Sequence, residues 1–211
     1  MVDISSLLAF VLAASVLTLT PGVDTAIVLR ALATGGRRQA LQAATGIAMG
    51  CLAWGAAASL GLGALLHASQ TAYTVVKLVG GAYLVWLGVK LLLASTTQRP
   101  VDPADAGFRP QANAFWQGLL TNLLNPKIGI FYVTFLPQFI APGAHVAGYS
   151  FFLAGVHVAL SLLWFGMLIA AAAPLGALLR RPDTAKTLDR LTGCIFVGFG
   201  VRLASSAPGL R

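Results

Sequence analysis

The sequence predicts an all-helical integral membrane protein whose chain crosses the bilayer six times. Of its 211 residues, 57% are hydrophobic and only 9% are charged, whereas a soluble domain carries about 25% charged residues. A soluble core of this size could not hide so much apolar surface, because surface-to-volume scaling leaves much of it exposed. The apolar residues also fall in runs of about 20 or more, the length that spans the hydrocarbon core. A bundle of membrane-embedded helices explains both observations.

Six apolar stretches are long enough to be spans. They cover residues 4–29, 39–66, 73–94, 114–140, 146–179 and 188–205. The first is too long for a cleavable signal peptide and lacks a basic start, so we expect it to be retained. Residues 96–113 contain three prolines and form the expected linker. We therefore expect a single transmembrane domain over 1–211, with repeat one at about 1–95 and repeat two at about 114–211.

Basic residues are concentrated at the odd-numbered connections between spans. Ten flank these connections: Arg30, Arg37, Arg38, Lys90, Arg99, Arg109, Arg180, Arg181, Lys186 and Arg190. The second and fourth connections carry neither Lys nor Arg. Because cytoplasmic loops are enriched in both residues, the odd connections should face the cytoplasm and both termini should lie outside.

The net charge of +8 does not indicate a nucleic-acid-binding protein, because the basic residues lie between apolar runs rather than on one polar face. No spacing of Cys, His and Asp indicates a metal site, and no glycine pattern indicates a phosphate loop. We also find no hydrolytic triad. The sequence therefore predicts no cofactor, no metal and no enzymatic activity.

Two pairs of stretches predict an internal repeat. Residues 81–91 and 193–203 share Gly, Val, Gly, Val and Leu in register, with Lys90 opposite Arg202. The first and fourth spans each contain a central proline followed closely by a charged residue. Three spans per repeat is an odd number, so the second copy must be inverted, as in many secondary transporters. The fold predicted is thus two inverted three-helix repeats, the first helix of each broken at a proline.

The two prolines mark the candidate functional site. Pro21, with Gly22 beside it, and Pro126 should break their helices, because proline lacks an N–H and its ring clashes with the preceding turn. Paired breaks in corresponding spans are the best sequence indication of a transporter site. Asp24 and Lys127 follow the breaks, and a charge deep in the bilayer needs a partner or a solvated cavity.

One acid and one base suit a zwitterion: Asp24 would hold its ammonium group, and Lys127 its carboxylate, helped by the helix N-terminus near Pro126. Two alternatives stay open, namely a structural ion pair between the two charges and a position of Asp24 near the membrane interface. Asn122 and Asn125 either contact the solute or satisfy backbone groups freed by the break.

Small residues indicate where helices pack closely. Gly46 and Gly50 have the small-xxx-small spacing that permits close approach of helices in membranes. Gly81 and Gly88 occur in the first of the two repeated stretches. We interpret these four glycines as helix-packing residues.

The chain resembles the LysE/RhtB family of amino-acid exporters. The resemblance covers nearly the whole sequence and is carried by residues 20–24 (TPGVD), 80–88 (GGAYLVWLG), 122–127 (NLLNPK) and 135–139 (FLPQF). The family usually has a second proline where this chain has Val23, a difference that affects the first break and leaves Asp24 in place. The resemblance implies a multi-pass exporter of amino acids or related metabolites in the bacterial inner membrane, driven by proton antiport. Its site residues would be Pro21, Asp24, Asn122, Asn125, Pro126 and Lys127.

Three hypotheses for function follow. The first is a secondary exporter whose partners are an amino-acid-like solute, protons and membrane lipid, and which is compatible with a homo-oligomer. The second is a non-transporting membrane scaffold or accessory subunit, which would not need both central charges. The third is a membrane thiol–disulfide carrier that uses Cys51 and Cys194, although these cysteines fall in the second and sixth expected spans and we therefore expect them to lie away from both prolines.

Overall fold

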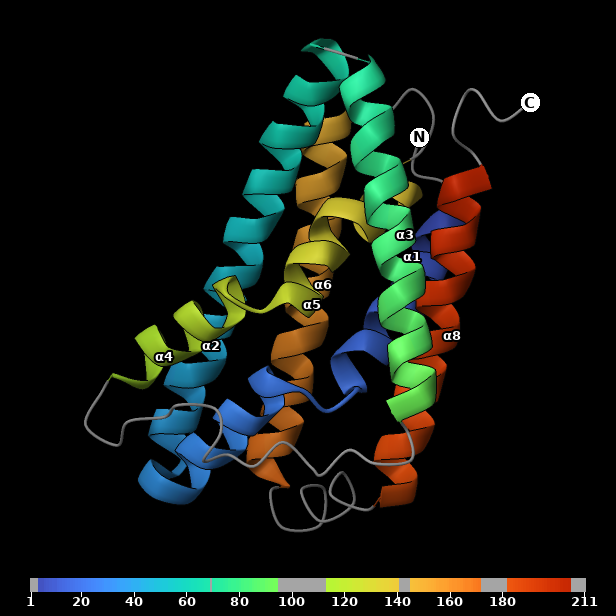
Figure 1. Cartoon of the computed structure of the whole chain (residues 1–211). Helices are drawn as coiled ribbons and strands as arrows, with labels where there is room; N and C mark the ends of the chain where they lie inside the picture. Colours follow the sequence, from blue (N-terminus) through green and yellow to red (C-terminus); the bar gives the residue numbers. More distant parts are fainter. Residues whose placement is uncertain (1–3, 69, 95–112, 141–144, 172–181, 206–211) are drawn as a thin grey trace.

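The computed structural model describes residues 4–68, 70–94, 113–140, 145–171 and 182–205, and these contain helices and no strand. The helices are α1 (Ile4–Leu19), α2 (Val23–Ala68), α3 (Gln70–Ala94), α4 (Ala114–Leu123), α5 (Pro126–Ile130), the π-helix η1 (Phe131–Phe135), the 3₁₀ helix η2 (Leu136–Phe139), α6 (Val146–Ala170) and α8 (Pro182–Ser205). Figure 1 shows them as one elongated bundle. The expected linker lies outside the described residues except for Asn113, and so does the end of the expected fifth span.

The described helices are those of a membrane protein. By length and composition, Val23–Gly61 and Val146–Ala170 could each cross a membrane, and Ala114–Leu123 with Pro126–Phe139 would add a third span bent by 53°. Two shorter helical segments, Ile4–Leu19 and Leu78–Lys90, are also apolar. Large apolar side chains cover the outside of the bundle, such as Ile4, Leu60 and Leu93, each 72% exposed. Such a surface suits lipid rather than water.

Helix α2 contains the connection expected between the first two spans. We predicted that the first span would end at residue 29 and the second would begin at residue 39, and α2 consists of two helices that meet at a kink within this interval. Its only non-helical residue is Gly36, with φ 69° and ψ −169°, and the chain reverses at the lower end of α2 in Figure 1. Glycine adopts this positive φ without the strain that a Cβ would cause. A single residue therefore makes the turn, and the connection is shorter than the predicted residues 30–38.

The fourth stretch is broken more than once. Helix α4 ends at Leu123 and α5 begins at Pro126. After five residues of α5 the chain widens into η1, where the Leu136 amide donates to the Phe131 carbonyl. Pro137 has no amide hydrogen to continue a regular helix, and the Thr134 hydroxyl bonds the Ile130 carbonyl at 2.8 Å. These local effects explain why this region is irregular.

The irregular region fills the centre of the bundle with aromatic rings. Phe131 and Tyr132 have no exposed surface and Phe135 has 1%. Phe131 stacks on Phe135 with ring centroids 5.2 Å apart, and the Phe10 ring of α1 lies 5.9 Å from Phe131. Large rings at the centre hold the broken segment in place despite its incomplete helix.

Close packing joins α2 to α4. A Cβ added at Gly46 would overlap the Phe115 carbonyl oxygen, and one added at Gly118 would overlap the Ala43 carbonyl oxygen. A Cβ at Gly50 would lie 2.5 Å from Oδ1 of Asn122. The backbones can approach this closely only because these positions lack side chains.

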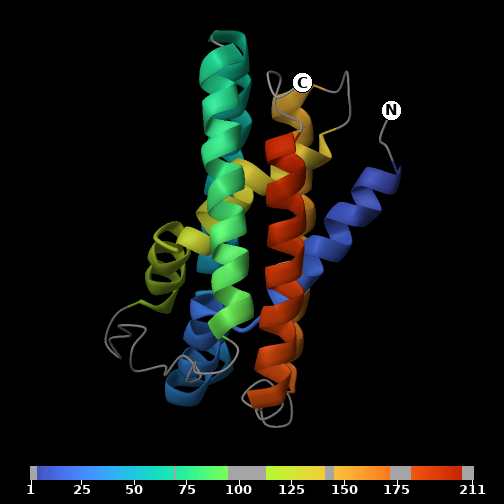
Figure 2. The ribbon, with the colours of Figure 1, turned by 45° about the vertical axis from the view of Figure 1, so that its right-hand side comes forward.

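Helices α3 and α8 form a second close pair, seen side by side in Figure 2. A Cβ at Gly88 would lie 2.7 Å from the Gly193 carbonyl oxygen, and one at Gly200 would lie 2.7 Å from the Gly81 carbonyl oxygen. In the repeat alignment Gly81 corresponds to Gly193 and Gly88 to Gly200. If residues 81–91 and 193–203 are exchanged, the contact of Gly88 with Gly193 becomes the contact of Gly200 with Gly81. A two-fold axis between the two helices would have the same effect.

The ends of the helices fall into two groups. The start of α1, the end of α8 and the junction of α2 with α3 lie at one end of the bundle in both views (Figures 1 and 2). The turn within α2, the end of α3 and the start of α8 lie at the other end. This arrangement has the alternation that the distribution of basic residues predicts.

Candidate functional site

The first break separates α1 from α2. The Thr20 amide and hydroxyl both donate to the Val16 carbonyl, at 3.0 and 2.7 Å, and the Thr20 hydroxyl also bonds that of Thr192 on α8. The chain then passes through Pro21 to Gly22, whose carbonyl accepts the Ala26 amide at 3.0 Å and opens α2. Side-chain hydroxyls thus provide hydrogen bonds at the end of α1.

At the second break, residues of the segment itself supply the hydrogen bonds that begin the new helix. The Asn125 side chain is the N-cap of α5 and accepts the Lys127 amide at 3.1 Å. The Asn125 carbonyl accepts the amides of Ile128 and Gly129 at 3.1 and 3.0 Å. We expected this helix start to help bind a carboxylate, but its first free amide is already engaged by Asn125.

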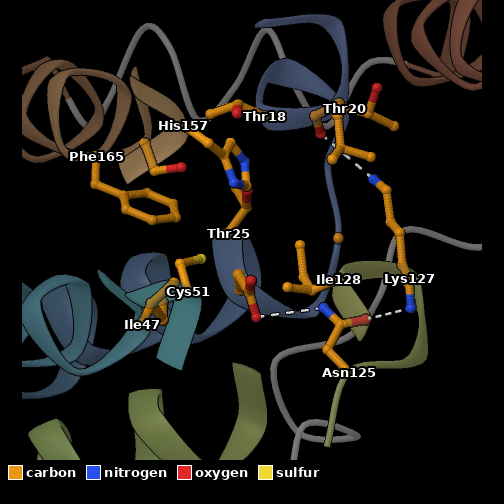
Figure 3. Close-up of a pocket in the computed structure, with 14 residues that line it drawn as sticks. Thr18, Thr20, Thr25, Ile47, Cys51, Asn125, Lys127, Ile128, His157 and Phe165 are labelled. Atoms are coloured by element: carbon orange, nitrogen blue, oxygen red, sulfur yellow. Dashed lines mark hydrogen bonds between the residues drawn. The ribbon is translucent and has the colours of Figure 1, made fainter. Parts of the chain in front are cut away.

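Hydrogen bonds connect the two breaks. The Asp24 carboxylate accepts Nδ2 of Asn122 at 2.8 Å and Nδ2 of Asn125 at 3.4 Å. The Lys127 ammonium donates to the Leu17 carbonyl at 3.4 Å, and Figure 3 shows its side chain extending from beside Asn125 toward Thr20. A cation near the last carbonyls of α1 is favourable, as is Asp24 in the first turn of α2, because helix ends carry partial charges of the opposite sign.

A cavity lies between the breaks and α6. It is lined by Leu17, Thr18, Thr20, Gly22, Asp24, Thr25, Ile47, Cys51, Asn125, Lys127, Ile128, His157, Ser161 and Phe165. Its volume is about 40 Å³, room for about three water molecules. An amino acid needs more space, so this is a closed arrangement of the chain.

The predicted site residues occupy four kinds of position. Asp24, Asn125 and Lys127 line the cavity together with Gly22, and Pro21 and Pro126 lie in the breaks. Asn122 is fully buried behind the cavity, where its Nδ2 contacts Asp24 and also Sγ of Cys51 at 3.5 Å. The glycines 46, 50, 81 and 88 lie at the helix contacts described above.

The cavity wall carries two groups of opposite charge, the Asp24 carboxylate and the Lys127 ammonium. The Asp24 carboxylate can accept hydrogen bonds from an ammonium group, and the Lys127 ammonium can donate to a carboxylate. In the closed cavity amides occupy the carboxylate and a backbone carbonyl accepts from the ammonium. A zwitterion could replace these weaker neutral partners with charged ones.

Several cavity residues were not predicted from the sequence. His157, Ser161 and Phe165 follow one another at intervals of four on α6 and so share a face. His157 is 2% exposed, and its Nδ1 lies 2.9 Å from the Tyr132 hydroxyl. In an apolar stretch this spacing cannot be distinguished from ordinary core packing. Only the position of the broken span identifies this face as cavity wall.

The cysteines and possible metal ligands add no further centre. Cys51 is buried and lines the cavity between the breaks, contrary to the expectation that it lies away from them, whereas Cys194 is exposed; both are free thiols. Among the described residues, no group of three or more His, Cys, Asp or Glu side chains could hold a metal ion.

Comparison with known proteins identifies a family. The model for the LysE type translocator matches residues 15–207. The chain is 32% identical to a leucine efflux protein of Klebsiella pneumoniae, covering 94% of each chain. It is 31% identical to an uncharacterized membrane protein of Bacillus subtilis (95% of this chain, 99% of the relative), and 29% identical to a threonine efflux protein of Escherichia coli (89% and 92%). No solved structure matches.

Proposed function

This chain belongs to the LysE type translocator family, and we propose that it is a secondary exporter that moves amino acids out of the cytoplasm by proton antiport. Members of this family are efflux transporters rather than enzymes, which sets aside the thiol–disulfide carrier. The relatives named for leucine and threonine efflux support an amino acid as the solute.

The observation that carries the proposal is the cavity between two helix breaks, with Asp24 and Lys127 both in its wall. A carboxylate and an ammonium match the two charges of an amino acid. A scaffold would need neither group at a cavity inside the membrane, where each is costly to insert.

Export requires the cavity to open alternately to each side. We propose that Asp24 takes up a proton when it releases the solute's ammonium group, so that proton entry and solute exit are linked. The domain would consist of two inverted three-helix repeats, with six spans in all, that rock about the cavity. The reciprocal contacts of Gly88 with Gly193 and of Gly81 with Gly200 support the two-fold relation.

We place the protein in the bacterial inner membrane with both termini outside, because ten basic residues flank the odd-numbered connections. Reporters fused after Arg37, Arg99 and Arg181 should then read cytoplasmic, and reporters after His67 and His145 should read external. A cytoplasmic signal after His67 would reverse this orientation.

The export function is tested in cells loaded with dipeptides, in which every released amino acid is quantified. Wild-type protein should increase the release of one or more amino acids. Asp24→Asn should abolish that increase, because the amide keeps the shape but removes the charge. The matched control is Asp183→Asn, which changes an exposed aspartate at the start of α8 and should export normally. No release above empty-vector cells would favour the scaffold.

A further inference from the structure

Three polar side chains of the cavity wall have hydrogen-bonding capacity that the described part of the chain does not use. Thr25 and Ser161 are each 5% exposed, and neither hydroxyl makes a hydrogen bond to another described residue. His157 uses Nδ1 for the Tyr132 hydroxyl, which leaves Nε2 without a described partner. All three residues line the cavity, and Figure 3 shows the His157 ring pointing into it.

Such groups are costly to bury without a partner. Leaving a buried donor or acceptor unsatisfied carries its full desolvation penalty, so polar groups inside proteins usually meet protein, water or a ligand. Here the open side of each group is the cavity. Water can occupy it in the closed arrangement, and the solute would replace that water when it binds.

Local structure holds these groups in a fixed direction. His157 and Ser161 are one helical turn apart on α6, and Thr25 lies in the first turn of α2 next to Asp24. The hydroxyl of Tyr132, a fully buried residue of η1, fixes the imidazole ring from behind. The polar groups are thus preorganised beside the charge that would hold the solute's ammonium.

Apolar side chains line the same cavity, among them Ile47 and Phe165. A solute with a purely apolar side chain would leave Thr25, His157 and Ser161 without partners. A site built to bond a hydroxyl rejects an analogue that lacks it more strongly than an apolar site rejects an added hydroxyl.

We propose that Thr25, His157 and Ser161 form a side-chain subsite that hydrogen-bonds a hydroxyl on the exported amino acid, so that hydroxylated solutes are favoured over apolar ones of the same shape. This inference rests on the proposed export function. Threonine and valine are the matched probes, because they differ only by a hydroxyl in place of a methyl group.

The test uses the purified full chain in proteoliposomes preloaded with equal amounts of labelled threonine and valine. Wild-type efflux should favour threonine by about tenfold or more. Ser161→Ala should lower the ratio of threonine to valine efflux by about fivefold, the worth of one hydrogen bond. Thr25→Val, which preserves shape, should lower it similarly, and the double variant should lower it further.

Ser150→Ala is the matched control. Ser150 lies on the same helix, is fully buried and has an unpartnered hydroxyl, but it does not line the cavity, so the ratio should stay at the wild-type value. Equal efflux of the two probes by wild-type protein, or an unchanged ratio in the double variant, would overturn the subsite while leaving export standing. If wild-type protein released no amino acid, the subsite and the proposed function would both fall.

Discussion

A proline marks each of the two helix breaks, but different residues supply the hydrogen bonds that the interrupted helices lose. At the second break Asn125 caps the new helix through its own side chain. At the first break the Thr20 hydroxyl bonds a carbonyl at the end of α1, and Asp24 lies in the first turn of α2. In the described hydrogen bonds between the two breaks, the second break supplies the donors and the first supplies the acceptors. The donors are Asn122, Asn125 and Lys127, and the acceptors are Asp24 and the Leu17 carbonyl.

This difference assigns separate tasks to the two breaks. The second is a set of donors on a segment held by buried aromatic rings, whereas the first presents an anionic acceptor beside the cavity. A solute that brings its own ammonium group competes with the two amides for Asp24. The first break is therefore where solute binding should be most sensitive to charge, and the second is where it should be most sensitive to geometry.

The largest effect is expected when both charges are removed. In a structural ion pair, losing one partner costs about 3–5 kcal/mol, because the other charge is left buried, and losing both restores stability. If the charges instead bind solute, Asp24→Asn/Lys127→Met should insert and fold at near-normal levels yet export nothing. Membrane levels and export by the double variant are measured together. Normal export would establish the structural pair and remove the site.

A smaller effect separates capping from donation at the second break. Asn125→Asp keeps an N-cap residue but replaces the amide donor with a carboxylate that repels Asp24. We expect export to fall about tenfold or more in this variant. Asn125→Ala loses the cap as well, worth about 1 kcal/mol, yet adds no repulsion, so its export should fall less. Greater export by Asn125→Asp than by Asn125→Ala would mean that Asn125 acts only as a cap.

The smallest effect concerns the support behind the breaks. A Cβ at Gly50 would press on the Asn122 side chain, so Gly50→Ala should destabilise the protein by about 1–3 kcal/mol through overpacking. At Gly166 on α6 no described atom lies within 4 Å of an added Cβ, and Gly166→Ala should be neutral or stabilising by up to about 1 kcal/mol. Thermal unfolding in detergent compares the two. An unchanged melting temperature for Gly50→Ala would show that Asn122 can move freely.

The sequence predicted the features that depend on local chemistry. Apolar runs located the helices, and Pro21 and Pro126 located the breaks, because length and a missing amide act within a few residues. The turn at Gly36 lies inside the connection predicted at residues 30–38, but its reduction to a single residue was not predicted, because one positive φ leaves no wider pattern in the sequence. His157 and Ser161 were missed because their role depends on a contact between α6 and the broken fourth stretch. Lys127 was recognised as a charge, but its contact with the Leu17 carbonyl depends on how two distant segments pack.

The most direct test of solute binding between the breaks uses Cys51, which lines the cavity beside Asp24. In a Cys194→Ser background, the rate at which a small permeant thiol reagent labels Cys51 is measured with and without a saturating exported amino acid. Bound solute should slow labelling several-fold, and Asp24→Asn should remove that protection. Equal labelling rates with and without an amino acid that the protein demonstrably exports would contradict a solute site in this cavity.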